Sequence, residues 1–240
     1  RVLARAELEV IRDLCVRHDV LAVTDEIYEH IRFEGEHVPL ATLPGMRDRT
    51  VTISGASKTF SVTGWRIGWI LAPAQLTDAI RKVHDFLTVG APAPLQEGVA
   101  VALDGLDRAF YDGLATAYRA RRELLYGALI DSGFSCTPPE GAYYILTDFS
   151  NLATPAGANG PLSDTEFAIW LSREIGVTPV PGSSFFRDGG GGRSLVRFVF
   201  CKTDDILLEA ARRLRSLRTV SPGSATTRSF EPAARSGLQQ

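Results

Sequence analysis

The sequence predicts an α/β fold, in which a mostly parallel sheet with flanking helices is followed by a smaller α/β domain. Segments with helical periodicity alternate with short apolar runs, as in layered α/β proteins. The first apolar run is continuous, which is typical of a strand that helices cover on both faces. After a long helical segment the pattern changes to short strands. We therefore expect two domains, at residues 1–120 and 121–218, and a disordered tail at 219–240.

The first domain opens with an amphipathic helix at residues 7–18, where Leu8, Ile11 and Leu14 recur at roughly helical spacing. An apolar run and a β-branched run follow, and each reads as a buried strand. The predicted elements after the first helix are strands at 20–24, 50–53 and 66–72, a helix at 75–87 and a helix that opens at 91–94.

The second domain follows a helix predicted at 106–132, which Gly133 is suited to end. Short apolar runs and periodic segments then alternate. They predict strands at 143–147, 177–180 and 195–200 and helices at 164–175 and 204–217. Loops rich in glycine or proline are expected at 151–162 and 188–192.

The composition excludes several classes of function. A net charge of −2 and a pI near 6.1 give no basic surface for nucleic acid and no polybasic membrane patch. The three cysteines are far apart, and neither they nor the four histidines show metal-ligand spacing, so no metal site is expected. There is no signal peptide and no membrane-spanning run, and we expect a cytoplasmic protein.

The residues that point most directly to a function lie in one stretch, at residues 54–69. The strand at 50–53 ends in small residues that let the backbone turn sharply before Lys58, which places an amine at a strand's carboxyl end. Hydroxyls and backbone N–H groups around Lys58 and Arg66 suit a phosphate. A lysine that can condense with an aldehyde beside an anion site suggests pyridoxal phosphate as cofactor.

Residues 55–68 resemble the lysine signature of class I/II aminotransferases, the fold-type I pyridoxal-phosphate enzymes. The resemblance implies that Lys58 is the catalytic residue that binds the cofactor covalently. It also implies that residues 1–120 are the later part of the large domain of such an enzyme, and residues 121–218 its small domain. An isolated lysine would otherwise be a solvated surface residue.

Arg66 is the main candidate for the phosphate site, because its planar guanidinium can bind a dianion in bidentate fashion. The resemblance assigns it the cofactor phosphate. Ser57 and Ser54 are further cofactor-binding candidates. Many family members place a serine three residues before the lysine, where this chain has Gly55, so which hydroxyl contributes stays open.

Asp25 follows an apolar strand, on the same edge as Lys58 if the two strands are parallel. A carboxylate there can keep the pyridine nitrogen of the cofactor protonated. The alternative is that Asp25 caps the N-terminus of a helix that begins directly after it. Residues 23–28 resemble the family pattern, which implies the cofactor role and places the hydroxyl of Tyr28 on the cofactor's phenolic oxygen O3′.

Arg197 lies in an otherwise apolar strand and shares a face with Leu195 and Val199. A charge surrounded by hydrocarbon needs an anion. The resemblance identifies that anion as the α-carboxylate of the substrate, and the alternative is a structural ion pair. Tyr143 and Tyr144 also lie in a segment that resembles the family's small domain, and the sequence assigns them no role.

The resemblance implies transamination between an L-amino acid and a 2-oxo acid, most similar to the enzymes for methionine, aromatic amino acids, glutamine or kynurenine, in a homodimer. A lyase or synthase on the same scaffold, or a ligand-binding module without catalysis, stays open. The chain opens on Arg1 without an initiator methionine, and the resemblance covers only the later part of a complete enzyme. We therefore expect residues 1–240 alone to bind the cofactor weakly and to turn over slowly or not at all.

Overall fold

The computed structural model describes residues 1–155, 161–187 and 191–219, so the expected tail and parts of both expected loops lie outside the described residues. The chain divides into two compact units. The first comprises Arg1–Arg119 and Pro139–Ala142. The second comprises Ala120–Pro138 and the described chain from Tyr143 onward.

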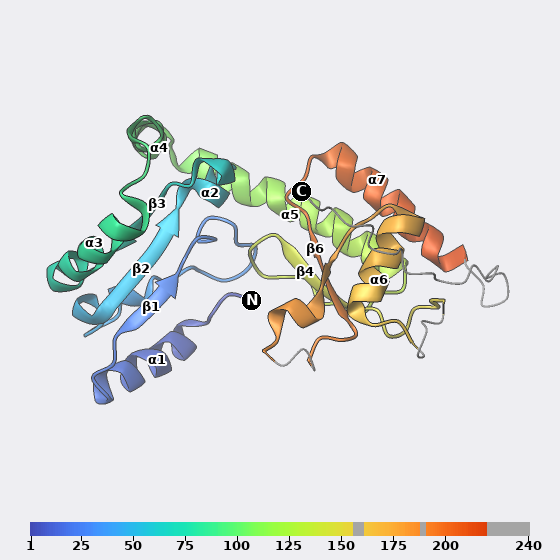
Figure 1. Cartoon of the computed structure of the whole chain (residues 1–240), viewed down its shortest axis with the longest axis horizontal. Helices are drawn as coiled ribbons and strands as arrows, with labels where there is room; N and C mark the ends of the chain where they lie inside the picture. Colours follow the sequence, from blue (N-terminus) through green and yellow to red (C-terminus); the bar gives the residue numbers. More distant parts are fainter. Residues whose placement is uncertain (156–160, 188–190, 220–240) are drawn as a thin grey trace, which may run out of the picture. The chain divides into compact units, whose positions relative to one another are not determined.

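The first unit contains a three-stranded sheet in the order β1-β2-β3 (Figure 1). Its strands are β1 (Ala22–Asp25), β2 (Thr50–Gly55) and β3 (Gly68–Leu71). β1 and β2 are parallel, whereas β2 and β3 are antiparallel. The described sheet is therefore mixed, and the expectation of a mostly parallel sheet is wrong for β3.

The direction of β3 agrees with the kind of connection before it. A parallel crossover usually contains a full helix that packs on the sheet. The connection from Gly55 to Gly68 holds only the one-turn α2 (Ala56–Thr59) and the 3-10 helix η3 (Thr63–Trp65), and β3 returns antiparallel to β2. β3 begins later than predicted because Arg66 adopts a left-handed conformation, which interrupts extended structure.

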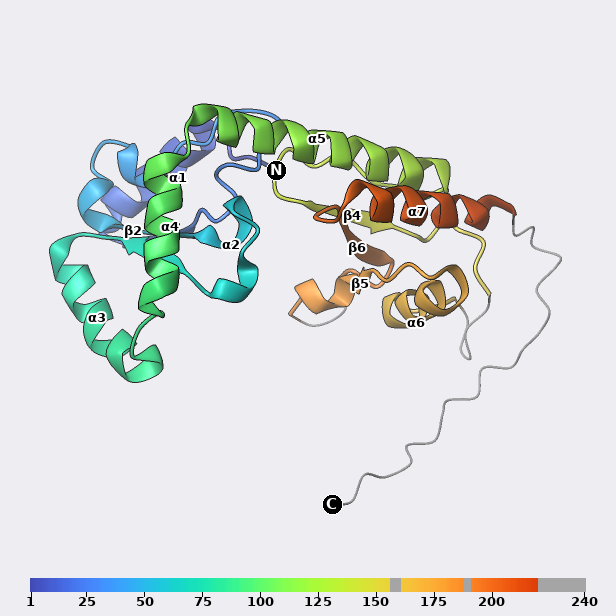
Figure 2. The same ribbon diagram turned by 90° about the horizontal axis from the view of Figure 1, so that it is seen from above.

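Besides the one-turn α2, the first unit contains longer helices. They are α1 (Arg5–Arg17), α3 (Ala74–Thr88), α4 (Ala93–Gly105) and the beginning of α5 (Arg108–Asp131). α1 packs Leu8 and Cys15 into an apolar cluster with Ala22 of β1. α4 packs through Val99 against Ile67 and Ala56, beside the end of β2 (Figure 2). These helices begin and end within a few residues of the predicted positions.

The second unit contains a smaller antiparallel sheet in the order β4-β6-β5. Its strands are β4 (Tyr144–Asp148), β5 (Val180–Pro181) and β6 (Leu195–Val199). Figure 2 shows α6 (Asp164–Trp170) on one face of this sheet, and α7 (Asp204–Arg215) with the later half of α5 on the other. The core is rich in aromatic residues and includes the stacked rings of Phe149 and Phe167, whose centroids lie 4.0 Å apart.

Candidate active site

The parallel pairing of β1 and β2 brings their carboxyl ends to one edge of the first sheet. Asp25 is the last residue of β1 and pairs in register with Ile53 of β2. Lys58 lies in α2, directly after β2, and is half-buried. Asp25 and Lys58 therefore lie at the same edge, as the sequence predicted.

The segment after Asp25 forms hydrogen-bonded turns and not a helix. The N–H of Glu29 donates to the carbonyl of Glu26, and the N–H of Ile31 to the carbonyl of Tyr28. Oδ1 of the exposed Asp25 accepts the N–H of Ile27 at 3.3 Å. Asp25 thus caps a turn, and the alternative in which it begins a helix is not realised.

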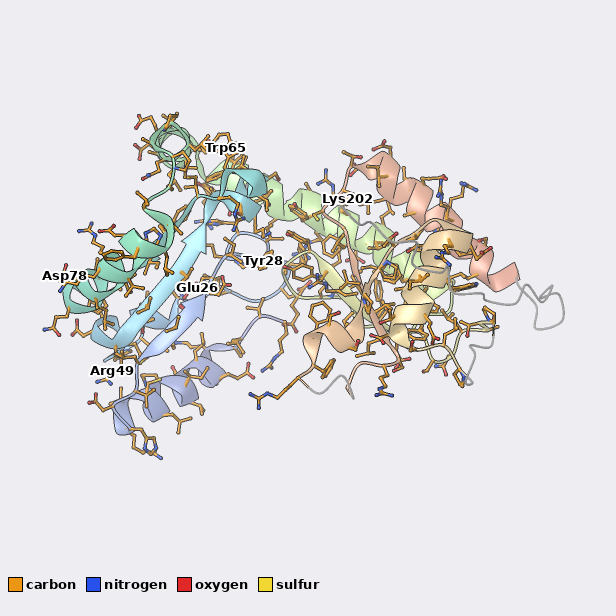
Figure 3. The ribbon with its side chains drawn as sticks, in the orientation of Figure 1. Glu26, Tyr28, Arg49, Trp65, Asp78 and Lys202 are labelled. Carbon is orange, nitrogen blue, oxygen red and sulfur yellow. The ribbon has the colours of Figure 1, made fainter. Side chains whose placement is uncertain are left out.

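Asp25 and Tyr28 line one cavity of about 420 Å³ in the first unit. Figure 3 shows Tyr28 and Glu26 just beyond the end of β1. Arg66 and Ser54 line a second cavity of about 590 Å³, between β3 and α3. Lys58 lines neither of these two cavities.

Sequence reasoning missed a buried carboxylate beside Asp25. Oε2 of Glu26 lies 2.8 Å from Nε2 of His37, and Oε1 accepts the hydroxyl of Thr24 at 2.9 Å. Burial raises the pKa of Glu26, but the hydrogen bonds from His37 and Thr24 outweigh it, so the pKa is lowered overall and the group is ionised at neutral pH. Glu26 thereby links the end of β1 to the loop that contains His37. The only signal in the sequence was its place beside Asp25.

The departure at Gly55 from the family's serine has a packing reason. A Cβ at Gly55 would lie 2.9 Å from the carbonyl oxygen of Ile67 and 3.0 Å from Cα of Gly68. These backbone atoms cannot move aside, because β2 and β3 pair at this point. Any side chain at position 55 would separate the two strands.

An aromatic cluster supports the segment that carries Lys58. The ring of Phe60 lies 5.9 Å from that of Phe110 and 6.5 Å from that of Tyr111, both at the beginning of α5. The ring of His30, from the turn after β1, lies 4.4 Å from Tyr111. Burial lowers the pKa of His30, which favours its neutral form. The end of β1 and the turn at Lys58 therefore contact the same helix.

Arg66 has an unusual backbone conformation. With φ 57° and ψ 38°, Arg66 lies in the left-handed region at the C-terminal end of η3. Nη1 of its guanidinium donates to the backbone carbonyl of Thr63 at 3.1 Å. This conformation costs roughly 1–2 kcal/mol for a residue with a Cβ. The ring of Trp65 packs against α4 at Gly98, where a Cβ would lie 3.1 Å from it. The guanidinium of Arg66 is exposed.

The two candidate serines differ in their surroundings. Ser54 is buried, and its hydroxyl donates to Oε1 of Glu29 at 2.7 Å, so its proton is already engaged by a carboxylate. This arrangement disfavours the expectation that Ser54 contacts a phosphate. Ser57 is half-buried and precedes Lys58 in α2.

In the second unit, Arg197 lies on β6, and its guanidinium contacts the rings of Tyr144 and Phe185. The guanidinium carbon is 4.5 Å from the ring centroid of Tyr144 and 4.4 Å from that of Phe185. Its Nε is buried and has no hydrogen-bond partner among the described residues. The alternative of a structural ion pair is not found in the described part of the chain. Sequence reasoning assigned no role to Tyr144 and did not single out Phe185.

Two further findings limit the kinds of site. Within residues 1–155, 161–187 and 191–219, no group of three or more histidine, cysteine or acidic side chains could hold a metal ion. In the same residues, no helix is both apolar and long enough to cross a membrane.

The comparisons with known proteins agree on one family. Residues 1–214 match the model for aminotransferase class I and II. The chain is 36% identical over 233 residues to kynurenine–oxoglutarate transaminase of Dictyostelium discoideum, covering 91% of this chain and 54% of that protein. It is 38% identical over 201 residues to methionine aminotransferase of Escherichia coli, covering 83% and 50%.

A solved structure gives the same result. N-succinyldiaminopimelate aminotransferase from Mycobacterium tuberculosis superposes with a TM-score of 0.83 at 39% identity, covering 90% of this chain and 55% of that one. The chain thus spans about half the length of the relatives that it matches. With its match over residues 1–214, this chain belongs to the class I and II aminotransferase family.

Proposed function

We propose that the protein takes part in pyridoxal-phosphate-dependent transamination between an L-amino acid and a 2-oxo acid. The observation that carries the proposal is the parallel pairing of β1 and β2, which brings Asp25 and Lys58 to one sheet edge. Family membership supports this chemistry. The first unit offers the donor types that the cofactor needs, an amine, a carboxylate, a phenol and a guanidinium, although Asp25 and Tyr28 line one cavity, Arg66 lines the other and Lys58 lines neither.

Lys58 is the residue proposed for the covalent bond and the proton transfer. Pyridoxal phosphate, when bound, supplies an electron sink for a carbanion at the Cα of an amino acid. Lys58 would hold the cofactor covalently through its amine, and the same amine, once released, would act as the general base that takes the proton from Cα.

Four other residues would bind and orient. The carboxylate of Asp25 would hold a proton on the pyridine nitrogen, and the hydroxyl of Tyr28 would donate to O3′. Arg66 would bind the phosphate in bidentate fashion, with Ser57 as the hydroxyl that contributes. These roles agree with the exposure of Asp25 and Arg66, which leaves both charges accessible.

Arg197 would bind the α-carboxylate of the substrate. Its buried Nε without a partner among the described residues supports this role, because such donors normally have a hydrogen-bond partner. For the amino acid we propose methionine, an aromatic residue, glutamine or kynurenine. The names of the relatives include kynurenine and methionine aminotransferases. We further propose a homodimer in a reducing cytoplasm.

The experiment is a cofactor titration of the purified chain, followed by amino-donor half-reactions. The wild-type protein should develop the visible absorption band of an imine with pyridoxal phosphate. Lys58→Ala should abolish it, whereas Lys82→Ala, on the exposed side of α3, should not. An unchanged band in the Lys58 variant would contradict the assignment.

The half-reactions then separate the possible reaction types. Each amino acid of the proposed set should yield its 2-oxo acid and an aminated cofactor. Release of ammonia or of a cleaved side chain would instead identify a lyase. Formation of the band without conversion of any amino acid, by this chain and by a chain of the relatives' full length alike, would be the result expected of a ligand-binding module.

A further inference from the structure

The guanidinium carbon of Arg197 lies over the faces of two aromatic rings. The centroids of Tyr144 and Phe185 lie 4.5 Å and 4.4 Å from its central carbon. Both distances are within the range in which an arginine interacts with a ring face. Tyr144 and Phe185 come from different elements, so tertiary structure builds this arrangement.

Backbone pairing places Tyr144 beside Arg197. In the antiparallel pairing of β4 and β6, Arg197 is directly opposite Leu146. Tyr144 lies two residues before Leu146 on β4, so it is on the same face of the sheet as Arg197 and is its diagonal neighbour. A ring at this position can reach across to the arginine.

Phe185 is placed by a close backbone contact. It ends the 3-10 helix η5 (Gly182–Phe185), which follows β5. A Cβ at Gly182 would lie 2.5 Å from the carbonyl oxygen of Leu195 and 2.6 Å from that of Gly192. Because position 182 has no side chain, η5 lies directly against the beginning of β6, and this brings the ring of Phe185 to Arg197.

The two rings desolvate the guanidinium without supplying a hydrogen-bond acceptor. A guanidinium donates hydrogen bonds only in its own plane. Nε of Arg197 is buried and has no partner in the described residues. A planar anion that meets the edge of the guanidinium in bidentate fashion, such as a carboxylate, satisfies the geometry.

We propose that Tyr144 and Phe185 are positioning residues that hold the guanidinium of Arg197 edge-on for a substrate carboxylate. The proposal rests on the proposed function, since it takes the carboxylate to be that of the amino acid or 2-oxo acid. It adds that the two rings, and not an ion pair, set the orientation of the arginine. They act by packing, so the hydroxyl of Tyr144 is dispensable.

The test monitors Arg197 directly, without turnover. The ¹H–¹⁵N resonance of its Nε is assigned by its loss in Arg197→Lys, and the protein is titrated with pyruvate or with methyl pyruvate, which has no carboxylate. Pyruvate should shift this resonance, and the ester should not. Phe185→Leu and Tyr144→Leu should each weaken pyruvate binding by about 3- to 10-fold.

Two matched variants act as controls. Tyr144→Phe keeps the ring, and Phe186→Leu makes the same change at the neighbouring phenylalanine, so both should bind pyruvate as the wild type does. Retained backbone spectra show that the leucine variants are folded. With transaminating protein, the leucine variants should raise KM for the amino acid by a similar factor and leave kcat within about twofold.

The results distinguish this proposal from the proposed function. If pyruvate binds as expected but no amino acid is converted, the positioning role stands and transamination fails. If turnover is normal while both leucine variants bind pyruvate like the wild type, the positioning role is wrong. An Nε resonance that pyruvate does not move also overturns it.

Discussion

Nε2 of His37 lies 2.8 Å from Oε2 of Glu26, the residue next to Asp25. The same carboxylate accepts the hydroxyl of Thr24, and the Glu26 side chain is only 8% exposed. An anion in this position links the loop that contains His37 to the end of β1. The turn that carries Asp25 and Tyr28 therefore depends on the charge of Glu26.

This dependence predicts a loss of stability in acid. Although burial raises it, the pKa of Glu26 is lowered below 4.5 overall by its hydrogen bonds to His37 and Thr24. The unfolded chain therefore takes up a proton first as the pH falls. The stabilisation is complete above about pH 4.5 and is lost as the pH falls below it.

Glu26→Gln should remove this part of the pH dependence and lower the free energy of unfolding at pH 7 by about 1–3 kcal/mol. Urea denaturation at pH 7 and at pH 4 measures both effects. Glu36→Gln, at an exposed carboxylate, is the control and should change neither. Equal pH dependence in the Glu26 variant and the wild type would contradict the prediction.

We expect Ser54 to have a structural role and Ser57 to bind the cofactor. Ser54→Ala removes a buried hydrogen bond to Glu29 and should cost about 1–2 kcal/mol of unfolding free energy, with cofactor affinity unchanged within about twofold. Ser57→Ala should lower cofactor affinity about tenfold with little effect on stability. Thermal unfolding measures the stability, and absorbance titration measures the cofactor affinity. A loss of cofactor affinity in Ser54→Ala and not in Ser57→Ala would show that Ser54 contacts the phosphate.

The close approach of β2 and β3 predicts that the family's serine is not tolerated at position 55. Gly55→Ser should destabilise the chain by about 1–3 kcal/mol, because its Cβ meets backbone atoms of Ile67 and Gly68. Gly64→Ser is the control, since a Cβ there has nothing within 4 Å, and it should stay within about 0.5 kcal/mol of the wild type. Similar unfolding midpoints for the two variants would argue against the packing constraint.

The phosphate role of Arg66 predicts that charge alone is insufficient. Arg66→Lys keeps the charge and loses the bidentate geometry, so cofactor affinity should fall about tenfold. Arg81→Lys, which alters an arginine of α3 lining the same cavity, should leave the affinity within about twofold. Absorbance titration measures the cofactor affinity of both variants. Pyridoxal, which has no phosphate, should bind equally well to the wild type and to Arg66→Lys.

The sequence predicted those features that depend on local patterns. Periodicity located α1 and α3, and the order of apolar runs was enough to place Asp25 and Lys58 at one sheet edge, because that required only that β1 and β2 be parallel. The direction of β3 was not predictable from its composition, since it depends on the connection before it, which contains no full crossover helix. The contacts of Tyr144 and Phe185 with Arg197 were missed because they arise from strand register and from a backbone contact at Gly182.

With the phosphate role proposed above, the left-handed backbone at Arg66 sets stability against cofactor binding at a single position. Glycine or asparagine would relax this conformation and could recover on the order of 1 kcal/mol, but neither can hold a dianion in two parallel hydrogen bonds. A laboratory selection for heat resistance alone would therefore drive arginine out of position 66. A selection for growth that needs the cofactor would restore it.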